Sequence, residues 1–473
     1  MVAASKMKWY ALGLLCMTQF LVVLDIAIVN VALPSIQSDL HFSQENLQWV
    51  ISAYALVFGG FLLLGGRMAD LLGRRRLFFI GLILFTLGSL LCGLAWSEGS
   101  LIAFRAFQGL GAATISPAAL SILTTTFAEG RERNIALGAW GAVGGVGAAA
   151  GVLLGGVLTD LLNWSWIFFV NVPVGIAALV LTPILLVESK DETTKSFDAL
   201  GAFLVTSGLV VLVLGITKGH DWGWASGRTI GVFVVSVALL GAFLAWESRH
   251  HEPLMPLSIF RLQTLTAANI SGLILGTALF AMFLMLTLYM QQVLGFSPMR
   301  TGVAYLAVAG TAIIWANVAA QVVNRVGVKP ALIFGMTMMT VGLLYFTRVS
   351  VGGSYLGDLL PGFLIIGCGM PFCFIPITIA SLAGTKPEQA GLASGLINTS
   401  QQIGGALGIA VLSTVATAGI HVGIRPSLEE LTHGFRNAFW VGAAVCAVGV
   451  LVSVFLVRGS DVAPQLSPAT EAA

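Results

Sequence analysis

The sequence predicts an all-α polytopic membrane protein, and two features of its composition indicate this class. Apolar residues make up 57% of the 473 residues, whereas Asp, Glu, Lys and Arg together make up only 9%. Soluble proteins carry about 25% charged residues. The apolar residues are also gathered into runs of about 18 to 28 residues, the length that an α-helix needs to cross a bilayer. A soluble protein is therefore excluded, and the net charge of +2 does not indicate a nucleic-acid partner.

Fourteen apolar runs are expected to form transmembrane helices, and most of the connections between them are short. Short connections favour antiparallel neighbours. In chain order the predicted spans are 9–34, 46–66, 77–96, 100–127, 134–160, 164–187, 199–217, 229–246, 265–294, 301–323, 330–349, 355–383, 390–418 and 437–457.

The positions of Lys and Arg predict how these helices are oriented. If the N-terminus is cytoplasmic, 16 of the 23 Lys and Arg residues fall in cytoplasmic segments, 6 fall in outer segments and Arg105 lies inside a span. Cytoplasmic loops carry an excess of these residues. We therefore expect a multi-pass protein of the cell (inner) membrane, with both termini in the cytoplasm and an even number of spans.

Two charged linkers, 188–198 and 247–261, bracket the seventh and eighth spans and divide the chain. Two related six-helix halves are a common transporter plan, with the substrate path at their interface. The polar end of the chain is expected to be disordered. The expected parts are an N-terminal six-helix bundle (1–187), a linker with transmembrane helices 7 and 8 (188–262), a C-terminal six-helix bundle (263–457) and a disordered cytoplasmic tail (458–473).

The first span contains an acid, Asp25, well inside its apolar run. A charged carboxylate near the bilayer interior costs about 3 kcal/mol or more, so it persists only if it is paired, solvated or protonated. The other Asp and Glu residues fall in loops, linkers, tails or the first turns of spans. Asp25 is therefore either a structural acid paired with a neighbouring helix or an acid that carries a proton or cation.

The fourth span contains a base, Arg105, with Gln108 on the same helical face. At 1.5 Å per residue, Asp25 lies about 13 Å below the outer end of the first span, if that span ends near Pro34. By the same measure Arg105 lies about 8 Å and Gln108 about 12 Å below the start of the fourth span. These similar levels suggest that Asp25 and Arg105 pair. An arginine that reaches the membrane interface is the alternative.

The short loop 66–76, GRMADLLGRRR, holds four arginines and one acid between glycines. Gly73 would permit a tight turn, and Asp70 could pair with an arginine or a helix N-terminus in one conformation only. This loop resembles the signature G-x-x-x-D-x-x-G-R-[RK]-[RK] of the major facilitator superfamily, where it acts as a cytoplasmic conformational latch. The resemblance implies a latch made by Gly66, Asp70, Gly73, Arg74 and Arg75.

Further motifs are similar to those of the fourteen-span drug–proton antiporter branch of that superfamily, the multidrug efflux type. Residues 24–34, LDIAIVNVALP, resemble a first-span motif whose acid is implicated in proton coupling. Residues 163–175, NWSWIFFVNVPVG, resemble the run WRWIFFxNxPxG, with Ser165 in place of arginine. Other resemblances occur at 101–113, which matches the fourth-span motif of proton-coupled members, and at 197–201, 289–298 and 390–408.

The fifth predicted span is rich in small residues, with the run GAVGGVGAAAGVLLGG at 141–156. Small residues at four-residue spacing let helices approach closely. The run resembles the antiporter motif with the core GPxxGG, except that Val152 replaces the proline, so import is not excluded. The glycines expected to serve helix packing and gating are Gly144, Gly147, Gly151, Gly155 and Gly156.

Several polar or aromatic side chains inside predicted spans are candidates for a substrate cavity, although each could instead be an interhelical hydrogen-bonding or packing group. Some members of the resembled antiporter branch carry extra acids in the second half for cationic drugs, and this chain has no mid-span carboxylate there. The resemblance therefore implies a lipophilic substrate that is neutral or singly charged. The candidates are Gln19, Gln108, Trp315, Asn317, Asn398, Gln401 and Gln402.

The resemblance implies a secondary active transporter that exports hydrophobic drug-like small molecules from the cytoplasm in exchange for protons, by alternating access. Such a protein would use the proton gradient, need no cofactor or metal, and function as a monomer in the lipid bilayer. A proton-coupled uptake symporter, or a facilitator of a small metabolite, is the alternative on the same fold. A membrane enzyme or ATP-driven pump is not expected, because the sequence has no G-x-x-x-x-G-K-[ST] phosphate loop.

Overall fold

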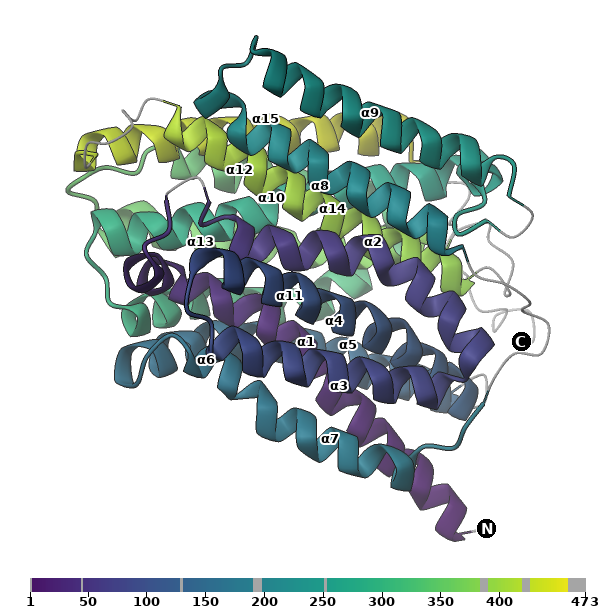
Figure 1. The fold of residues 1–473 in the computed structure, drawn as a ribbon. Coiled ribbons are helices and arrows are strands. Elements are labelled where there is room, and N and C mark those ends of the chain that lie inside the picture. The colour runs from purple at the N-terminus through teal and green to yellow at the C-terminus, as the bar shows by residue number, and fades with distance from the viewer. Residues whose placement is uncertain are drawn as a thin grey trace, which may run out of the picture.

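The structure is a computed structural model that describes residues 2–43, 46–127, 131–189, 198–250, 253–382, 390–418 and 426–457. In these ranges the regular secondary structure is helical and no strand is formed. The long helices lie side by side, roughly along one direction (Figure 1). The predicted all-α class is therefore confirmed.

The first part of the chain forms helices close to the predicted spans. Their bounds are α1 (Val2–Leu40), α2 (Trp49–Leu72), α3 (Arg74–Gly93), α4 (Glu98–Thr126), α5 (Arg131–Leu161), the short α6 (Trp166–Phe169) and α7 (Asn171–Leu185). A hairpin follows, made by α8 (Ala199–Trp222) and α9 (Gly227–Glu247).

The remaining helices also follow the apolar runs, and two of the predicted spans include π-helical turns. Their bounds are the 3₁₀ turn η1 (Leu257–Arg261), α10 (Gln263–Leu288), the π-helix η2 (Tyr289–Val293), α11 (Pro298–Val326), α12 (Val328–Phe346), the π-helix η3 (Tyr355–Leu359), α13 (Leu360–Ser381), α14 (Ala390–Thr417) and α15 (Leu428–Phe455).

Twelve helical segments of the described chain are long and apolar enough to cross a membrane. The apolar segment Val146–Leu161 of α5 is shorter, and α14 is not among the twelve. The structure thus supports a multi-pass membrane protein, while the count of fourteen spans stays a prediction.

Two of the helices that extend beyond their predicted spans do so for clear physical reasons. The first span was expected to end near Pro34, but α1 continues through this proline to Leu40. A proline inside a helix removes one backbone hydrogen bond, and the fully buried Leu33 and Ile36 around it pack against the core and keep the chain helical. The last helix begins at Leu428 rather than at 437, because Ser427 and Glu430 form a capping box ahead of the apolar run.

The ends of the helices define two faces of the bundle, which we call the N-terminal face and the far face. The N-terminal face is the end at which α1 begins, and there Lys8 Nζ lies 2.7 Å from the Glu132 carboxylate at the start of α5. At the far face, Trp164 Nε1 donates to the Asp39 carboxylate at 2.6 Å. The helix α1 therefore runs from the N-terminal face to the far face.

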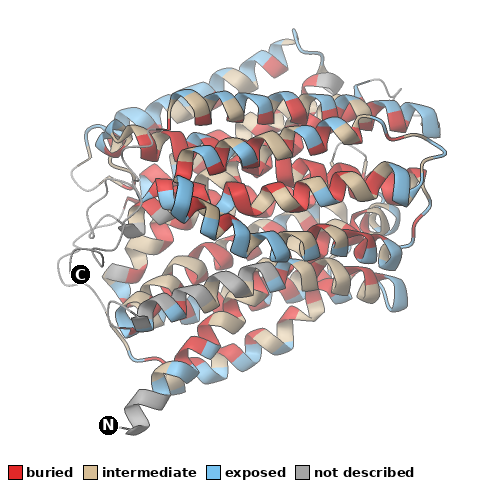
Figure 2. Cartoon of the chain, turned by 180° about the vertical axis from the view of Figure 1, so that it is seen from behind, coloured by how far each residue is buried: buried red, intermediate tan, exposed pale blue. Residues whose placement is uncertain are grey.

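The helices form two groups with the α8–α9 hairpin beside them. In the first group α1 packs on α5, and α2 and α3 pack on α4; in the second, α10 packs on α14 and α12 packs on α13. The hairpin packs against α2 and α14, one helix from each group. Burial is concentrated inside the groups, whereas α9 lies at the edge of the molecule and is exposed along much of its length (Figure 2). The division into three parts remains a prediction that these contacts support.

Candidate functional site: a buried ionic network around Asp25

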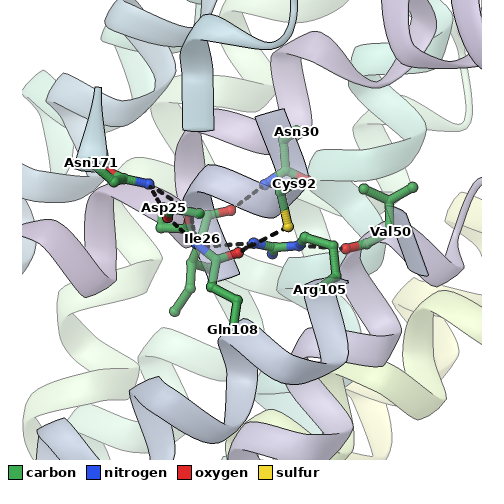
Figure 3. Close-up of polar contacts among 9 residues, drawn as sticks. Asp25, Ile26, Asn30, Val50, Cys92, Arg105, Gln108 and Asn171 are labelled. Atoms are coloured by element: carbon green, nitrogen blue, oxygen red, sulfur yellow. Dashed lines mark hydrogen bonds and ion pairs between the residues drawn. The ribbon is translucent and has the colours of Figure 1, made fainter. Parts of the chain in front are cut away.

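Asp25 and Arg105 form an ion pair in the interior of the first helix group (Figure 3). Arg105 Nη1 lies 2.7 Å from Asp25 Oδ2. The two residues are 0% and 1% exposed, so the pair is cut off from solvent. This contact confirms the pairing that their similar depths suggested, and it shows that Arg105 does not reach toward the membrane interface.

Two neutral amides complete the surroundings of the Asp25 carboxylate. Gln108 Nε2 donates to Asp25 Oδ1 at 2.8 Å, and Asn171 Nδ2 donates to the same oxygen at 2.9 Å. Both carboxylate oxygens are thus satisfied by donors from α4 and α7. A buried ionised carboxylate is stable only when it is paired and hydrogen-bonded in this way.

The guanidinium of Arg105 makes four further contacts. Its Nε donates to the backbone carbonyl of Val50 at 2.9 Å, and its Nη1 donates to Gln108 Oε1 at 2.6 Å. The ring of Tyr54 lies 4.3 Å from the guanidinium carbon, and the ring of Phe168 lies at 5.6 Å. Because a cation over an aromatic face is stabilised further when it is desolvated, the arginine has one fixed position.

An outer layer from α3 links the amides to one another. Ser89 Oγ accepts from Gln108 Nε2 at 2.6 Å and from Asn171 Nδ2 at 3.2 Å. Cys92 Sγ lies 3.7 Å from Gln108 Oε1. The network therefore draws on α1, α2, α3, α4 and α7, and a shift of any of these helices would alter the donors around Asp25.

The members of the site that sequence reasoning missed include Ser89, Tyr54 and Asn171. Asn171 lies in the quoted run NWSWIFFVNVPVG, at the point where the short α6 gives way to α7. An asparagine inside an apolar segment was the signal that could have identified it. Its Oδ1 atom and the Tyr54 hydroxyl are buried without a hydrogen-bond partner among the described residues. Each of these two groups could therefore form a further hydrogen bond.

The predicted latch is built around a tight turn at the N-terminal face. Gly73 has a φ of 108°, a conformation that favours glycine. The Glu188 carboxylate, just after α7, accepts from the backbone N–H groups of Arg75 at 3.1 Å and Arg76 at 3.2 Å. A Cβ at Gly73 would lie 2.7 Å from this carboxylate, so a larger residue there would displace the Glu188 side chain.

Two other residues of the predicted latch, Gly66 and Arg74, contact neighbouring segments. Gly66 packs against Pro117 of α4, and the Arg74 backbone N–H donates to the Ser189 carbonyl at 2.9 Å. The side chain of Asp70, on which a conformational exchange of partners was predicted to depend, lies outside the described residues. Glu188 is the acid that the structure shows in contact with this loop, and no sequence pattern indicated it.

The small residues of α5 bring that helix close to the backbone of α1, as predicted. A Cβ on Gly151 would lie 2.8 Å from the Leu24 carbonyl, next to Asp25, and one on Gly155 would lie 2.6 Å from the Ile28 carbonyl. Gly147 faces Phe20 and Val23, and Gly156 faces Pro298 at the start of α11. The surroundings of Gly144 lie outside the described residues. These glycines therefore connect Asp25's own helix to the contact between the two groups.

The cavity candidates do not form one cluster. Gln108 is fully buried in the Asp25 network instead. Gln402 is also buried and packs against Gly59 of α2, with Nε2 lacking a partner among the described residues. Gln401 packs against Gly276 of α10, and Gln19 Oε1 is buried without a described partner. The exposed candidates are Trp315, Asn317 and Asn398.

The two groups also meet at the far face. Gln291 Nε2 donates to the Val31 carbonyl at 2.7 Å, and Gln292 Nε2 donates to Gln37 Oε1 at 3.0 Å. At the same end, Gly302 of α11 packs on the Val152 carbonyl of α5. Toward the N-terminal face, by contrast, α11 exposes Ile313, Ile314, Trp315, Asn317 and Val318.

The described residues contain no group of three or more His, Cys, Asp and Glu side chains that could hold a metal ion.

Comparisons with known proteins place this geometry in context. A match to the family described as Major Facilitator Superfamily covers residues 15–409. The puromycin resistance protein pur8 of Streptomyces alboniger is 38% identical over 94% of this chain and 89% of its own length. The cephamycin export protein CmcT of Amycolatopsis lactamdurans is 39% identical over 93% of this chain and 91% of its own length.

A more distant relative and two solved structures agree with these matches. The tetracenomycin C resistance and export protein of Streptomyces glaucescens is 35% identical over 87% of this chain and 76% of its own. The peptide transporter POT in complex with sulfate superposes with a TM-score of 0.68 at 16% identity, covering 96% of this chain and 95% of its own. The human organic anion transporter MFSD10 gives 0.66 at 15% identity, covering 94% of this chain and 99% of its own. At such low identity, the structures show a shared fold alone.

Proposed function

Because the chain belongs to the major facilitator superfamily, a family of membrane transporters rather than enzymes, we propose that it exports hydrophobic, drug-like small molecules from the cytoplasm in exchange for protons. The observation that carries the proton coupling is the fully buried Asp25, held by Arg105, Gln108 and Asn171. Export is supported by relatives that are named for antibiotic resistance or export and match nearly the whole chain.

In this proposal the N-terminal face is cytoplasmic, and fourteen helices span the cell membrane. The Lys and Arg bias supports that orientation, and Arg74, Arg75 and Arg76 all lie at this face beside the Gly73 turn. Both termini would then be cytoplasmic. The parts would be the bundle 1–187, the linker 188–262, the bundle 263–457 and the tail 458–473, acting as a monomer.

Coupling would arise because Asp25 has two alternative partners. In the structure the carboxylate is neutralised by Arg105. A proton that reaches Asp25 would remove its charge and weaken this contact, since a neutral acid attracts a guanidinium less. Arg105 would keep the Val50 carbonyl and the Tyr54 ring. The five helices that meet at the network would then shift, which links proton binding to a change of conformation.

The packing between the groups supports an alternating-access cycle seen in one of its states. At the far face, the hydrogen bonds from Gln291 and Gln292 to α1 connect the two groups. The exposed half of α11 carries Trp315 and Asn317, and the Trp315 ring lies 6.3 Å from that of Phe372. These residues would line a path open to the cytoplasm. The substrate path would run between the groups and be completed by Asn398, Gln401 and Gln402.

The substrate would be lipophilic and neutral or singly charged. Its site would be built from polarisable and aromatic side chains of the second group, with amides as the polar partners. No cofactor would be required, because the proton gradient supplies the energy.

Uptake with protons, or facilitated transport, is the second candidate. It is retained because Val152 replaces the proline of the antiporter motif in α5. The direction in which the drug moves relative to the protons separates the two. In inside-out vesicles, an exporter releases protons from the lumen when drug is added, whereas an uptake symporter moves drug and protons together out of the lumen.

Growth of a drug-sensitive bacterial host that expresses the chain tests export. The panel contains puromycin, tetracenomycin C and a cephamycin, together with a lipophilic dye for direct efflux measurements. We expect a raised inhibitory concentration for at least one compound in the wild type and none in Asp25→Asn. Wild-type expression that protects against no compound and exports no dye would contradict export.

A further inference from the structure

A second pair of buried acids lies at the N-terminal-face end of the α8–α9 hairpin, in a part of the fold that the Asp25 network does not use. Asp198 directly precedes α8 and is 2% exposed, and Glu247 is the last residue of α9 and is 3% exposed. Next to them, Ala202 and Leu254 form an apolar cluster with Leu64 of α2. Neither acid makes a described ion pair with Lys or Arg.

Each acid has one satisfied and one unsatisfied oxygen. Asp198 Oδ1 accepts from the Gly201 backbone N–H at 2.7 Å and from Trp246 Nε1 at 2.8 Å. Glu247 Oε2 accepts from the Met255 backbone N–H at 2.9 Å. The other oxygens, Asp198 Oδ2 and Glu247 Oε1, are buried and have no hydrogen-bond donor among the described residues.

The two unsatisfied oxygens face the same point. A Cβ placed on Gly201 would clash with both Asp198 Oδ2 and Glu247 Oε1, so they lie together beside this glycine. Two carboxylates that share a buried site repel each other when both are ionised, so protonation of one of them is favoured. One hydrogen atom on either oxygen, donated to the other, would satisfy both at once.

We propose that Asp198 and Glu247 share one proton and form a proton-binding site, separate from Asp25, that closes the N-terminal-face end of the α8–α9 hairpin. This inference does not depend on the proposed transport activity. It depends on the burial of the pair, the two unsatisfied oxygens and their common position at Gly201.

The groups that face the pair identify Asp198 as the ionised member. Burial raises the pKa of the Asp198 carboxyl, but the hydrogen bonds from Gly201 and Trp246 outweigh this effect and hold that pKa below its usual range. His250, whose ring stacks on Trp246 at 5.0 Å, lowers it further. The proton therefore sits on Glu247.

The other elements packed around the pair contribute few charges. On α2, Arg67 is the charged residue of the stretch 61–68 that packs beside Ala202 and Leu254, and α14 carries no charged residue. Arg249 and Arg261 lie in the segment that follows α9. The segments 190–197 and 251–252 lie outside the described residues.

The hairpin makes polar contacts with both helix groups near its other end. Gln48 Nε2 donates to Thr217 Oγ1 at 3.1 Å, and Thr414 Oγ1 donates to the Ile216 carbonyl at 3.3 Å. Loss of the shared proton would leave two charges in an apolar site and loosen the hairpin at the N-terminal face. The shared proton is lost as pH rises, so the closed end should lose stability at alkaline pH.

Infrared spectroscopy of the purified full chain tests the site. A protonated carboxyl gives a C=O stretching band distinct from that of a carboxylate. We expect this band at about pH 6, its loss at alkaline pH, and its absence in Glu247→Gln. Asp198→Asn should also remove it, since the acid then loses the charged neighbour that keeps it protonated. This second variant provides the test if Glu247→Gln does not fold.

Two control variants distinguish the pair from other acids. Glu132→Gln removes an exposed carboxylate that is paired with Lys8, and Asp25→Asn removes the carboxylate that is paired with Arg105. The band should survive in both. A wild-type protein without the band at about pH 6, or a band that persists in the Glu247 and Asp198 variants, would overturn the proposal. So would a band that disappears only in Asp25→Asn.

Discussion

The chain holds buried acids in two regions, and it stabilises them in opposite ways. Asp25 lies in the first helix group with a guanidinium and two amides around it. Asp198 and Glu247 lie at the end of the α8–α9 hairpin, with each other and with backbone N–H groups as partners. Where a cation is present the acid can stay ionised. Where it is absent, one proton must take its place.

This difference bears on how each region responds to pH and to mutation. The Asp25 network depends on a specific partner, so removing Arg105 should be costly at every pH at which Asp25 is ionised. The Asp198–Glu247 pair depends on a proton, so removing one carboxylate should matter mainly when the proton would otherwise be lost. Four substitutions test this contrast, from the largest expected effect to the smallest.

Arg105→Leu should have the largest effect on stability, because it leaves the Asp25 charge buried and unpaired. Breaking a buried ion pair in this way costs about 3–5 kcal/mol. Thermal and denaturant unfolding in detergent would measure the loss. Adding Asp25→Asn should recover a large part of it, since the double variant holds no uncompensated charge. A double variant that is no more stable than Arg105→Leu would show that the two side chains are not coupled.

Asn171→Leu should have the next largest effect, since it removes a donor to the Asp25 carboxylate and a contact with Ser89. A hydrogen bond to a charged group contributes about 1.5–3 kcal/mol. Asn30→Leu is the matched control, because Asn30 donates only to the Ile26 carbonyl of its own helix among the described contacts. Equal losses of stability in the two variants would indicate that Asn171 has no special role at Asp25.

Gly151→Ala should disturb the position of Asp25 itself. The added Cβ would lie 2.8 Å from both the Leu24 carbonyl and the Ala27 Cβ, so α5 and α1 must separate. Overpacking of this kind costs about 1–3 kcal/mol. Gly13→Ala in α1 is the control, since nothing lies within 4 Å of the new Cβ there. In a helix that change should stabilise by about 0.5–1 kcal/mol. The comparison fails if both variants unfold at the same temperature as the wild type.

The smallest expected effect is that of Asp198→Asn on stability at acidic pH. The pKa of Asp198 is lower in the folded protein than its usual value of about 3.9. Asp198 therefore adds stability that is present above that value and is lost as pH falls through the folded pKa. The free energy of unfolding of the wild type should fall below about pH 4. That of Asp198→Asn should fall less over the same pH range. The same loss of stability at acidic pH in the variant and the wild type would contradict an ionised Asp198.

The sequence predicted most of the fold because the apolar runs are long and the bilayer fixes their length. Boundaries failed where packing or capping outweighed composition, as at Pro34 and Ser427. The Asp25–Arg105 pair could be hypothesised because both residues are costly in a membrane, although the depth estimate for Asp25 assumed that the first helix ends at Pro34 rather than at Leu40. Asn171 was not identified as a partner, since a neutral amide carries no such cost.

The Asp198–Glu247 pair could not be predicted for a different reason. Both residues lie at the edges of charged linkers, where acids are ordinarily solvated, and nothing in the sequence shows that residues 198 and 247 meet. Their burial depends on the hairpin folding back so that Gly201 faces both of them. Glu188 at the Gly73 turn was missed for the same reason. Charged residues at span ends thus need the tertiary structure before their role can be argued.

Transport by purified protein in proteoliposomes tests most directly whether proton binding at Asp25 drives export. Wild type and Asp25→Asn are reconstituted with a drug selected from the resistance panel, and a pH gradient is imposed across the membrane. We predict that the gradient drives uphill drug movement by the wild type, and that Asp25→Asn binds the drug but loses gradient-driven accumulation. Full gradient-driven transport by Asp25→Asn would contradict the account.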